Sequence, residues 1–503
     1  MGRFETITRA PGAKSGSWRG AVKACNRWLY WGHRWLGIVT CLLCVMWFLS
    51  GLVMLYVPFP SWSDAERLTH LPRVAIERVF VTPDDAFAAS GAKALPQTFR
   101  LEMLADEPVY RVVAGGKISS ISAVTGQPVG PVDAEQARRH VVAVFPGTQP
   151  KLIEALGYDQ WTVARRFDAH RPLYKLTLDD GLGTIVYVSS KTGEIVQNAT
   201  RNERFWNWLG AVPHWIYFSP IRKDQELWRQ AVMWLSGPLV IGAIAGFWIG
   251  ILRLRVRQPY AQARVTPYRG WMKWHHVGGL AGGLFLTTWI ASGWLSVNPF
   301  SLFARTQFSD AQRVAYAGWS EGQPFGVTLA ALRAAGDERP TEISFVRIGG
   351  EPRLLAKRND STVMVEPESG SLAVIADAEL IAAARRALPA ADMVRADRLT
   401  EEDLYWYSHH RKRPLPILKV EFDDPSATWL FIDPATAGIV AVSDRSARVY
   451  RWLFNFLHDY DLPILLRNQP ARDILVWVLS IAGLVVSVSG IVVGWRVLAR
   501  RIS

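Results

Sequence analysis

The residues best suited to chemistry in this chain are its histidines. There are ten, and four of them recur at a near-constant spacing: His275 follows His33 by 242 residues, and His458 follows His214 by 244. A neutral imidazole is a ligand of haem iron, and an ionisable residue beside an apolar segment favours a functional site. Two residues related by a two-fold axis approach one iron from opposite sides. We therefore expect His33 with His275, and His214 with His458, to be the axial ligands of two haems.

Two alternatives stay open for these histidines. His276 competes with His275, because a change of one residue rotates a helical position by about 100°. A histidine at the entrance of a membrane helix also bonds lipid headgroups without binding a metal. The sequence has no CxxCH motif, so any haem is expected to be non-covalent haem b.

The three cysteines give a weaker signal. Cys41 and Cys44 have CxxC spacing within one apolar stretch, where thiols serve as packing residues or as a redox or metal site. Cys25 lies in the basic segment before it, and no cysteine lies in the two long segments that follow the apolar stretches. A disulfide framework is therefore not expected there, and those domains need hydrophobic cores.

Glycines with small-xxx-small spacing accompany the histidines. These are Gly242, Gly246 and Gly250, Gly278 and Gly282, Gly279 and Gly283, and Gly490 and Gly494. The spacing lets helices pack closely, and the alternative is that it leaves room for a flat porphyrin.

Four apolar stretches must position these residues. Half of the 503 residues are hydrophobic, 20% are charged, and 23 tryptophans outnumber 14 tyrosines, a composition typical of proteins with tryptophan at membrane interfaces. The stretches run roughly over 35–57, 231–252, 277–297 and 474–495, each long enough to span a bilayer. The sequence predicts an integral membrane α+β protein with four transmembrane helices and a retained first helix rather than a cleaved signal peptide.

The distribution of charge sets the expected topology. The net charge is +13, and the excess lies in residues 1–34, 253–273 and 496–503, each beside an apolar stretch. This pattern indicates cytoplasmic loops rather than a nucleic-acid surface. We expect both termini in the cytoplasm of a bacterium with an inner membrane and two large periplasmic domains. The predicted boundaries are a basic tail (1–27), helix 1 (28–58), domain 1 (59–203), an interfacial segment (204–227), helix 2 (228–253), a basic loop (254–271), helix 3 (272–299), domain 2 (300–447), an interfacial segment (448–472), helix 4 (473–496) and a tail (497–503).

The chain also repeats itself with a period near 242. Residues 31–51 align without gaps on residues 273–293, with Gly37 on Gly279 and Trp47 on Trp289. In the second half of each unit, Trp208 aligns with Trp452. A unit with two spans returns the chain to its starting side. The sequence therefore predicts two parallel repeats related by a pseudo-two-fold axis along the membrane normal.

Each exported segment is predicted to be α+β. Helices are expected near Pro83 and Asp133, and "TIVYVSSKTGEIV" predicts a hairpin whose turn lies at residues 191–193. "VMVEPESGSLAV" and "WLFIDPATAGIV" repeat that pattern. The hairpin resembles the PepSY module, and "HRWLG…WFLSG" with "WHH…GG…WIASG" resembles the PepSY-associated transmembrane helices. The Ala437-Gly438 turn departs from the usual Thr-Gly, with an effect expected on structure only.

The resemblance implies an inner-membrane haem-containing reductase of ferric siderophores. Its partners would be the lipid bilayer, a cytoplasmic electron donor or a quinol, and a periplasmic ferric chelate. A weaker substrate site is the "YWYSHHRKRPLP" segment, in which His409, His410, Arg411 and Arg413 suit an anionic chelate and the alternative is a solvated loop. A membrane-anchored PepSY module that binds a peptide or modulates a peptidase is the second hypothesis. A transporter comes third, because the spans contain no broken helix and no buried charge.

Overall fold

The computed structural model describes residues 15–304, 307–359, 361–409 and 412–502, with side chains described from residue 23 to residue 500. The predicted positions His410 and Arg411 lie outside the described residues. The chain forms two compact units. Unit 1 contains residues up to Leu52, Gln230–Pro299 and the chain from Pro470 on, and unit 2 contains Val53–Arg229 and Phe300–Gln469.

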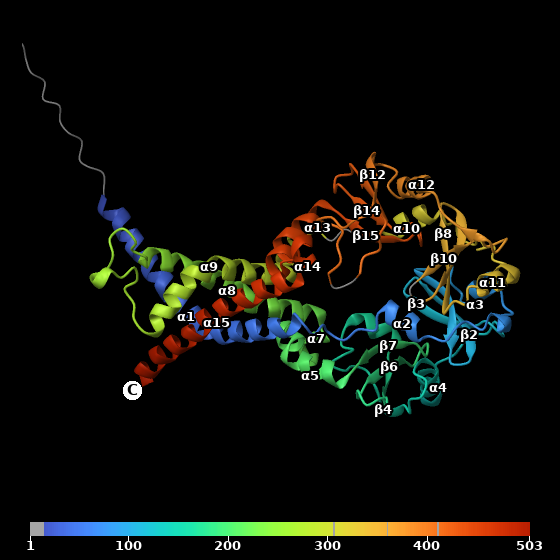
Figure 1. The fold of residues 1–503 in the computed structure, drawn as a ribbon, viewed down its shortest axis with the longest axis horizontal. Coiled ribbons are helices and arrows are strands. Elements are labelled where there is room, and N and C mark those ends of the chain that lie inside the picture. The colour runs from blue at the N-terminus through green and yellow to red at the C-terminus, as the bar shows by residue number, and fades with distance from the viewer. Residues whose placement is uncertain (1–14, 305–306, 360, 410–411, 503) are drawn as a thin grey trace, which may run out of the picture. The chain divides into compact units, whose positions relative to one another are not determined.

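Unit 1 is built from long helices. Figure 1 shows them running alongside one another, joined on one side by a loop with a short 3-10 helix, η3 (Ala261–Ala263). The long helices are α1 (Ser15–Met54), α8 (Gln225–Arg253), α9 (Trp271–Ser296) and α15 (Gln469–Ile502). Three of them are long and apolar enough to cross a membrane, over Lys23–Met54, Gln225–Arg253 and Gln469–Arg500.

The count of such helices among the described residues is therefore three, where the sequence analysis predicts four. The predicted helix over 272–299 exists as α9, and its 26 residues are enough to span a bilayer. Its apolar residues are diluted by glycines at 278, 279, 282, 283 and 293 and by a Thr-Thr pair at 287–288. These residues add little to the free energy of transfer into lipid, so α9 does not join the other three.

Unit 2 contains the β-structure, in three antiparallel sheets (Figure 1). The strand orders are β11-β10-β9-β8-β1-β2-β3, β4-β5-β6-β7 and β12-β13-β14-β15. The strands are β1 (Thr98–Leu104), β2 (Glu107–Ala114), β3 (Lys117–Ser122), β4 (Lys151–Leu156), β5 (Leu173–Thr177), β6 (Ile185–Ser189), β7 (Ile195–Ala199), β8 (Glu342–Ile348), β9 (Glu351–Lys357), β10 (Thr362–Val365), β11 (Leu372–Ala373), β12 (Met393–Leu399), β13 (Ile417–Phe422), β14 (Trp429–Ile432) and β15 (Ile439–Ser443).

The helices of unit 2 begin at polar caps. Asp133 and Gln136 form a capping box at the start of α4, and Thr82 caps α3, which begins at Pro83. Both helices confirm the predicted starts. The helical elements are α2 (Asp64–His70), η1 (Ile76–Arg78), α3 (Pro83–Ala89), α4 (Ala134–Val144), η2 (Arg165–His170), α5 (Arg201–Leu209), α6 (Ala211–His214), α7 (Ser219–Arg222), η4 (Pro299–Ser301), α10 (Asp310–Ala317), α11 (Leu329–Gly336), α12 (Asp377–Ala387), α13 (Arg445–Tyr450), the π-helix η5 (Arg451–Asp459) and α14 (Pro463–Arg467).

The two exported segments share one sheet, whereas the sequence analysis treats them as separate domains. β1 from the first segment pairs with β8 from the second through Arg100↔Ser344 and Leu101↔Ile343. Aromatic rings cross this junction, with the centres of Phe99 and Phe345 4.6 Å apart. A strand that ends at an unpaired edge exposes its backbone groups, so this pairing gives each half a neighbour that hydrophobic patterning alone does not specify.

The predicted hairpins form, and their turns require a left-handed residue. Gly193 follows β6 with φ of 73°, as a residue without a Cβ does readily. In the hairpin between β14 and β15 the corresponding residue is Ala437, with φ of 54°. Its carbonyl oxygen accepts a hydrogen bond of 2.7 Å from the Tyr316 hydroxyl. The alanine is thus held in an unfavourable conformation by a buried contact, which is the structural consequence of the departure from Thr-Gly.

Candidate functional site

Two predicted histidines meet inside unit 1. His33 lies on α1 and His275 on α9, and the centres of their imidazole rings are 6.1 Å apart with an angle of 38° between the ring planes. Both side chains are half-buried. Residues that are 242 positions apart in the sequence therefore face each other between helices.

Each of these rings is oriented by a backbone carbonyl of a third and a fourth helix. His33 Nδ1 lies 2.9 Å from the carbonyl oxygen of Gly242 on α8, and His275 Nδ1 lies 3.0 Å from that of Val486 on α15. A carbonyl oxygen only accepts hydrogen bonds, so Nδ1 carries the proton in both rings. The other nitrogen, Nε2, then has a free lone pair, which is the tautomer that a metal ligand needs.

The separation of the rings suits one iron between them. A metal–imidazole bond is about 2 Å long, and the nitrogen lies about 1.1 Å from the centre of its ring, so the ring centres of two ligands on opposite sides are about 6 Å apart. The measured 6.1 Å equals this span. Within the described part of the chain, no group of three or more His, Cys, Asp or Glu residues forms a metal site. The donor set therefore fits a metal that brings its remaining ligands with it, as haem iron does.

The competitor, His276, lies in a different environment. It is 6% exposed, its Nε2 is 3.0 Å from the carbonyl oxygen of Gly250, and its ring packs against Tyr268. His275 and not His276 faces His33. The register of the gap-free alignment is thus the one that brings two imidazoles together.

The glycines separate into two groups. A Cβ on Gly246 would lie 2.4 Å from Cε1 of His33, and one on Gly490 would lie 3.3 Å from Cε1 of His275. Most of the small-xxx-small glycines contact a side chain in this way, which is the packing interpretation. Gly279, one turn beyond His275, has no atom within 4 Å of its Cβ position, and Gly37, one turn beyond His33, has only Cys41 Sγ at 3.9 Å. Open space beside both ligands is the cradle that a flat ring would fill.

The cysteines are free thiols, and Cys25 is exposed. Cys41 Sγ would lie 2.6 Å from a Cβ on Gly490, so this thiol packs against the glycine beside His275. This contact favours the packing interpretation of the CxxC spacing.

The second predicted pair meets inside unit 2. His214 ends α6, His458 lies in η5, and their ring centres are 6.3 Å apart at an angle of 67°. Both side chains are half-buried. Phe454 stacks on the imidazole of His458, with ring centres 5.2 Å apart. The separation again equals the span of two imidazoles on opposite sides of one iron.

The π-helix that carries His458 is anchored by a buried charge. Arg451 donates hydrogen bonds to the carbonyl oxygens of Leu404 and Asp461, at 2.6 and 2.9 Å. The Tyr407 hydroxyl donates to the carboxylate of Asp461, which is 1% exposed. Burial raises the pKa of Asp461 above its ordinary value, although Tyr407 and Arg451 oppose this shift. Wide π-turns are often found at functional sites, and here the anchors fix the segment that presents His458.

The weaker substrate site is not assembled as a binding surface by its described members. The Arg413 guanidinium lies 4.7 Å from the centre of the Trp406 ring, and its backbone nitrogen donates to Ser408 Oγ. His409 is half-buried in the same loop. Arg413 therefore stabilises its own loop around the buried Trp406.

The carbonyls of Gly242 and Val486 are the site groups that sequence reasoning missed. A backbone oxygen leaves no mark in the sequence. The only available signal was their spacing of 244 residues, which equals that of His214 and His458. The chain matches no family model, and no curated protein is similar to it.

Proposed function

We propose that this chain binds two b-type haems and carries electrons across a membrane from a cytoplasmic donor to an acceptor on the other side. The observation that carries the proposal is the recurrence of one geometry: two histidine pairs with ring centres 6.1 and 6.3 Å apart. Haem iron supplies one-electron transfer when it is bound between two such imidazoles. His33 and His275 would hold the inner haem, and His214 and His458 the outer one.

The residues of this chain prepare the ligands. The carbonyls of Gly242 and Val486 keep the proton on Nδ1 of the inner histidines, so that Nε2 is available without the loss of a proton at binding. Arg451 and Phe454 hold the helix and the ring of His458 in place. The outer site therefore depends on a rigid segment of the exported unit.

The membrane topology belongs to the same proposal. We infer that α9 crosses the bilayer with the three more apolar helices, because the stretch 277–296 contains no ionisable residue. The corresponding contacts of His33 with α8 and of His275 with α15 support two parallel repeats. Since His33 and His275 lie beside basic segments, we assign the inner haem to the cytoplasmic face of a bacterial inner membrane. The outer haem belongs to the periplasmic face, because a span of about 20 residues covers roughly 30 Å.

The acceptor is proposed to be a ferric chelate such as a ferric siderophore, which takes one electron to become a ferrous chelate. The proposal follows the resemblance to PepSY-associated membrane reductases. The donor is a cytoplasmic redox protein or a quinol. The alternative is a PepSY module that binds a ligand in the exported unit without redox activity.

The test begins with the colour of the full-length protein purified from haem-replete cells. We expect a Soret band, close to two haems per chain, and complete extraction by acid-acetone because no thioether bond holds them. In proteoliposomes, His458→Ala should keep an inner haem that an internal reductant reduces, but electron delivery to an external ferric chelate should stop. His33→Ala should remove the inner haem and leave the outer one reducible from outside.

His70→Ala serves as the control, because His70 is an exposed histidine of unit 2 outside both pairs. It should keep both haems and the rate of ferric-chelate reduction. A colourless protein from haem-replete cells would refute the redox proposal and favour the binding module.

A further inference from the structure

A second candidate site lies in unit 2, where two strands separate. β1 and β8 pair only at Arg100↔Ser344 and Leu101↔Ile343, while β8 continues to Ile348. A cavity of about 690 Å³ opens beyond the last pair. The rest of β8 lines it together with β15, which is the edge strand of its sheet. Cavities of about 300–1,000 Å³ are the usual size for small organic ligands.

This cavity contains a buried cation without a counter-ion. Arg347 is 6% exposed, and its two terminal nitrogens donate to the carbonyl oxygens of Gly350 and Pro324. Its Nε is buried and has no hydrogen-bond partner, and no carboxylate of the described residues lies within ion-pair distance of the guanidinium. A buried charge without a partner is costly, so an anion beside Arg347 would be stabilised.

The other cations of the cavity are already neutralised. Arg67 lies 2.7 Å from Glu102, and Lys357 lies 2.8 Å from Glu342. Glu342 and Asp64 line the same cavity, so a compact polyanion would be repelled there. The arrangement therefore favours a ligand with a single negative charge.

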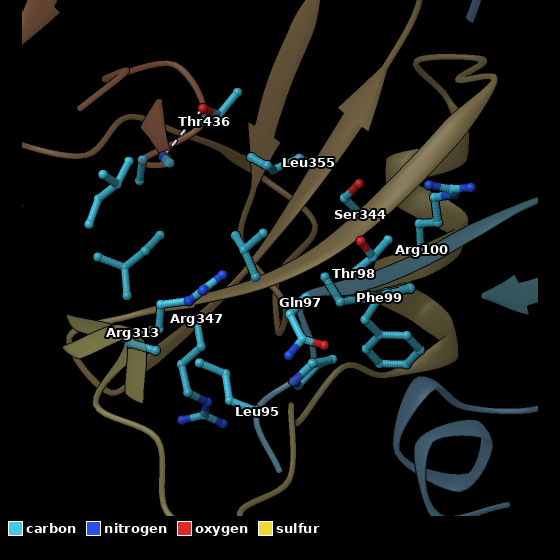
Figure 2. A pocket seen from close by; sticks show the side chains of 18 of the residues that line it. Leu95, Gln97, Thr98, Phe99, Arg100, Arg313, Ser344, Arg347, Leu355 and Thr436 are labelled. Carbon is cyan, nitrogen blue, oxygen red and sulfur yellow. Dashed lines mark hydrogen bonds between the residues drawn. The ribbon is translucent and has the colours of Figure 1, made fainter. Parts of the chain in front are cut away.

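The remaining lining is suited to an apolar body. Figure 2 shows Arg313 and Arg347 on one side of the cavity and Arg100 and Ser344 on the other. Between them the lining includes the apolar side chains of Leu95, Phe99, Ile348, Leu355 and Val440. We propose that the cavity binds an organic monocarboxylate whose carboxylate pairs with Arg347 and whose apolar part lies against β8 and β15.

The experiment compares 2-naphthoate with its neutral counterpart, 2-naphthamide. The full-length protein is reconstituted in nanodiscs of zwitterionic lipid, and binding is measured by equilibrium dialysis with empty nanodiscs as the blank. We expect saturable binding of one naphthoate per chain and at least tenfold weaker binding of the amide. Arg347→Gln should weaken naphthoate binding at least tenfold, and Arg347→Lys should weaken it less because the charge remains.

Arg353→Gln is the matched control, because Arg353 lies on the neighbouring strand β9, near Glu366, and does not line the cavity. If Arg347→Gln does not fold, Val440→Trp provides the second test. Val440 is 40% exposed on the edge strand, and a tryptophan there should fill the cavity and block binding without touching the guanidinium.

Equal binding of acid and amide, unchanged binding in the folded Arg347→Gln variant, or no binding above the blank would each overturn the proposal. Haem content is measured in every variant and should equal that of the unchanged chain. A failure of this proposal is thereby distinguished from a failure of the haem proposal, since the cavity shares no residue with the histidine pairs.

Discussion

Gly246→Ala tests the inner haem site through space alone. A Cβ at this position would lie 2.4 Å from Cε1 of His33, whereas ordinary contact begins at 3.4 Å. The imidazole would have to move by about 1 Å, which is half the length of a metal–nitrogen bond of about 2 Å. The added methyl group therefore cannot coexist with the present position of the ring, and we expect the inner haem to be lost.

The assay is haem per chain, measured as the pyridine haemochrome of the purified protein. Gly246→Ala should lower the value from near two to near one, because the outer pair lies in unit 2 and is unchanged. Gly242→Ala is the control. It lies one turn away on the same helix, and its Cβ would be 3.6 Å from the Cβ of Leu36, an ordinary contact. Both substitutions raise helix propensity by the same amount, about 0.5–1 kcal/mol, so they differ only in what the methyl group meets.

Two results would contradict this reasoning. If Gly246→Ala keeps two haems, His33 is not held as a ligand at this position. If Gly242→Ala loses as much haem as Gly246→Ala, the effect comes from helix packing in general and not from the histidine.

Two further predictions concern register and topology. His275→Ala should remove the inner haem and His276→Ala should retain it, since only His275 faces His33; the reverse result, read from haem content, would mean that the computed register is wrong by one residue. Reporter fusions after residues 130 and 380 should be active only with an enzyme that requires export, and activity of a cytoplasm-dependent reporter at either position would refute the N-in, C-in topology.

The sequence predicted the elements that depend on local patterns. The capping residues at Thr82 and Asp133 mark the starts of α3 and α4, and the hairpin turn at residues 191–193 lies where the Thr-Gly pair indicates it. The apolar stretches predicted the long helices. The number that pass as spanning helices was overestimated because the glycines of α9 reduce its hydrophobicity, although they interrupt no apolar run.

The candidate site was predictable to a different degree in its different parts. The four histidines were identified from their spacing, because a repeated unit carries the same residue at the same place. The choice between His275 and His276 needed the structure, since both lie on one helix and only packing decides which of them faces α1. The orienting carbonyls were not predictable, because every residue has one and the geometry selects Gly242 and Val486.

The sequence by itself determined the apolar helices, the repeated histidines and the hairpins, because each depends on residues near one another in the chain or on a recurring pattern. Only the tertiary structure decided which rings face each other, that β1 pairs with β8, and that Arg347 is buried without a counter-ion. These features join residues separated by more than 200 positions, or concern what surrounds a side chain in space. Such contacts depend on how whole elements pack, and no local pattern encodes that packing.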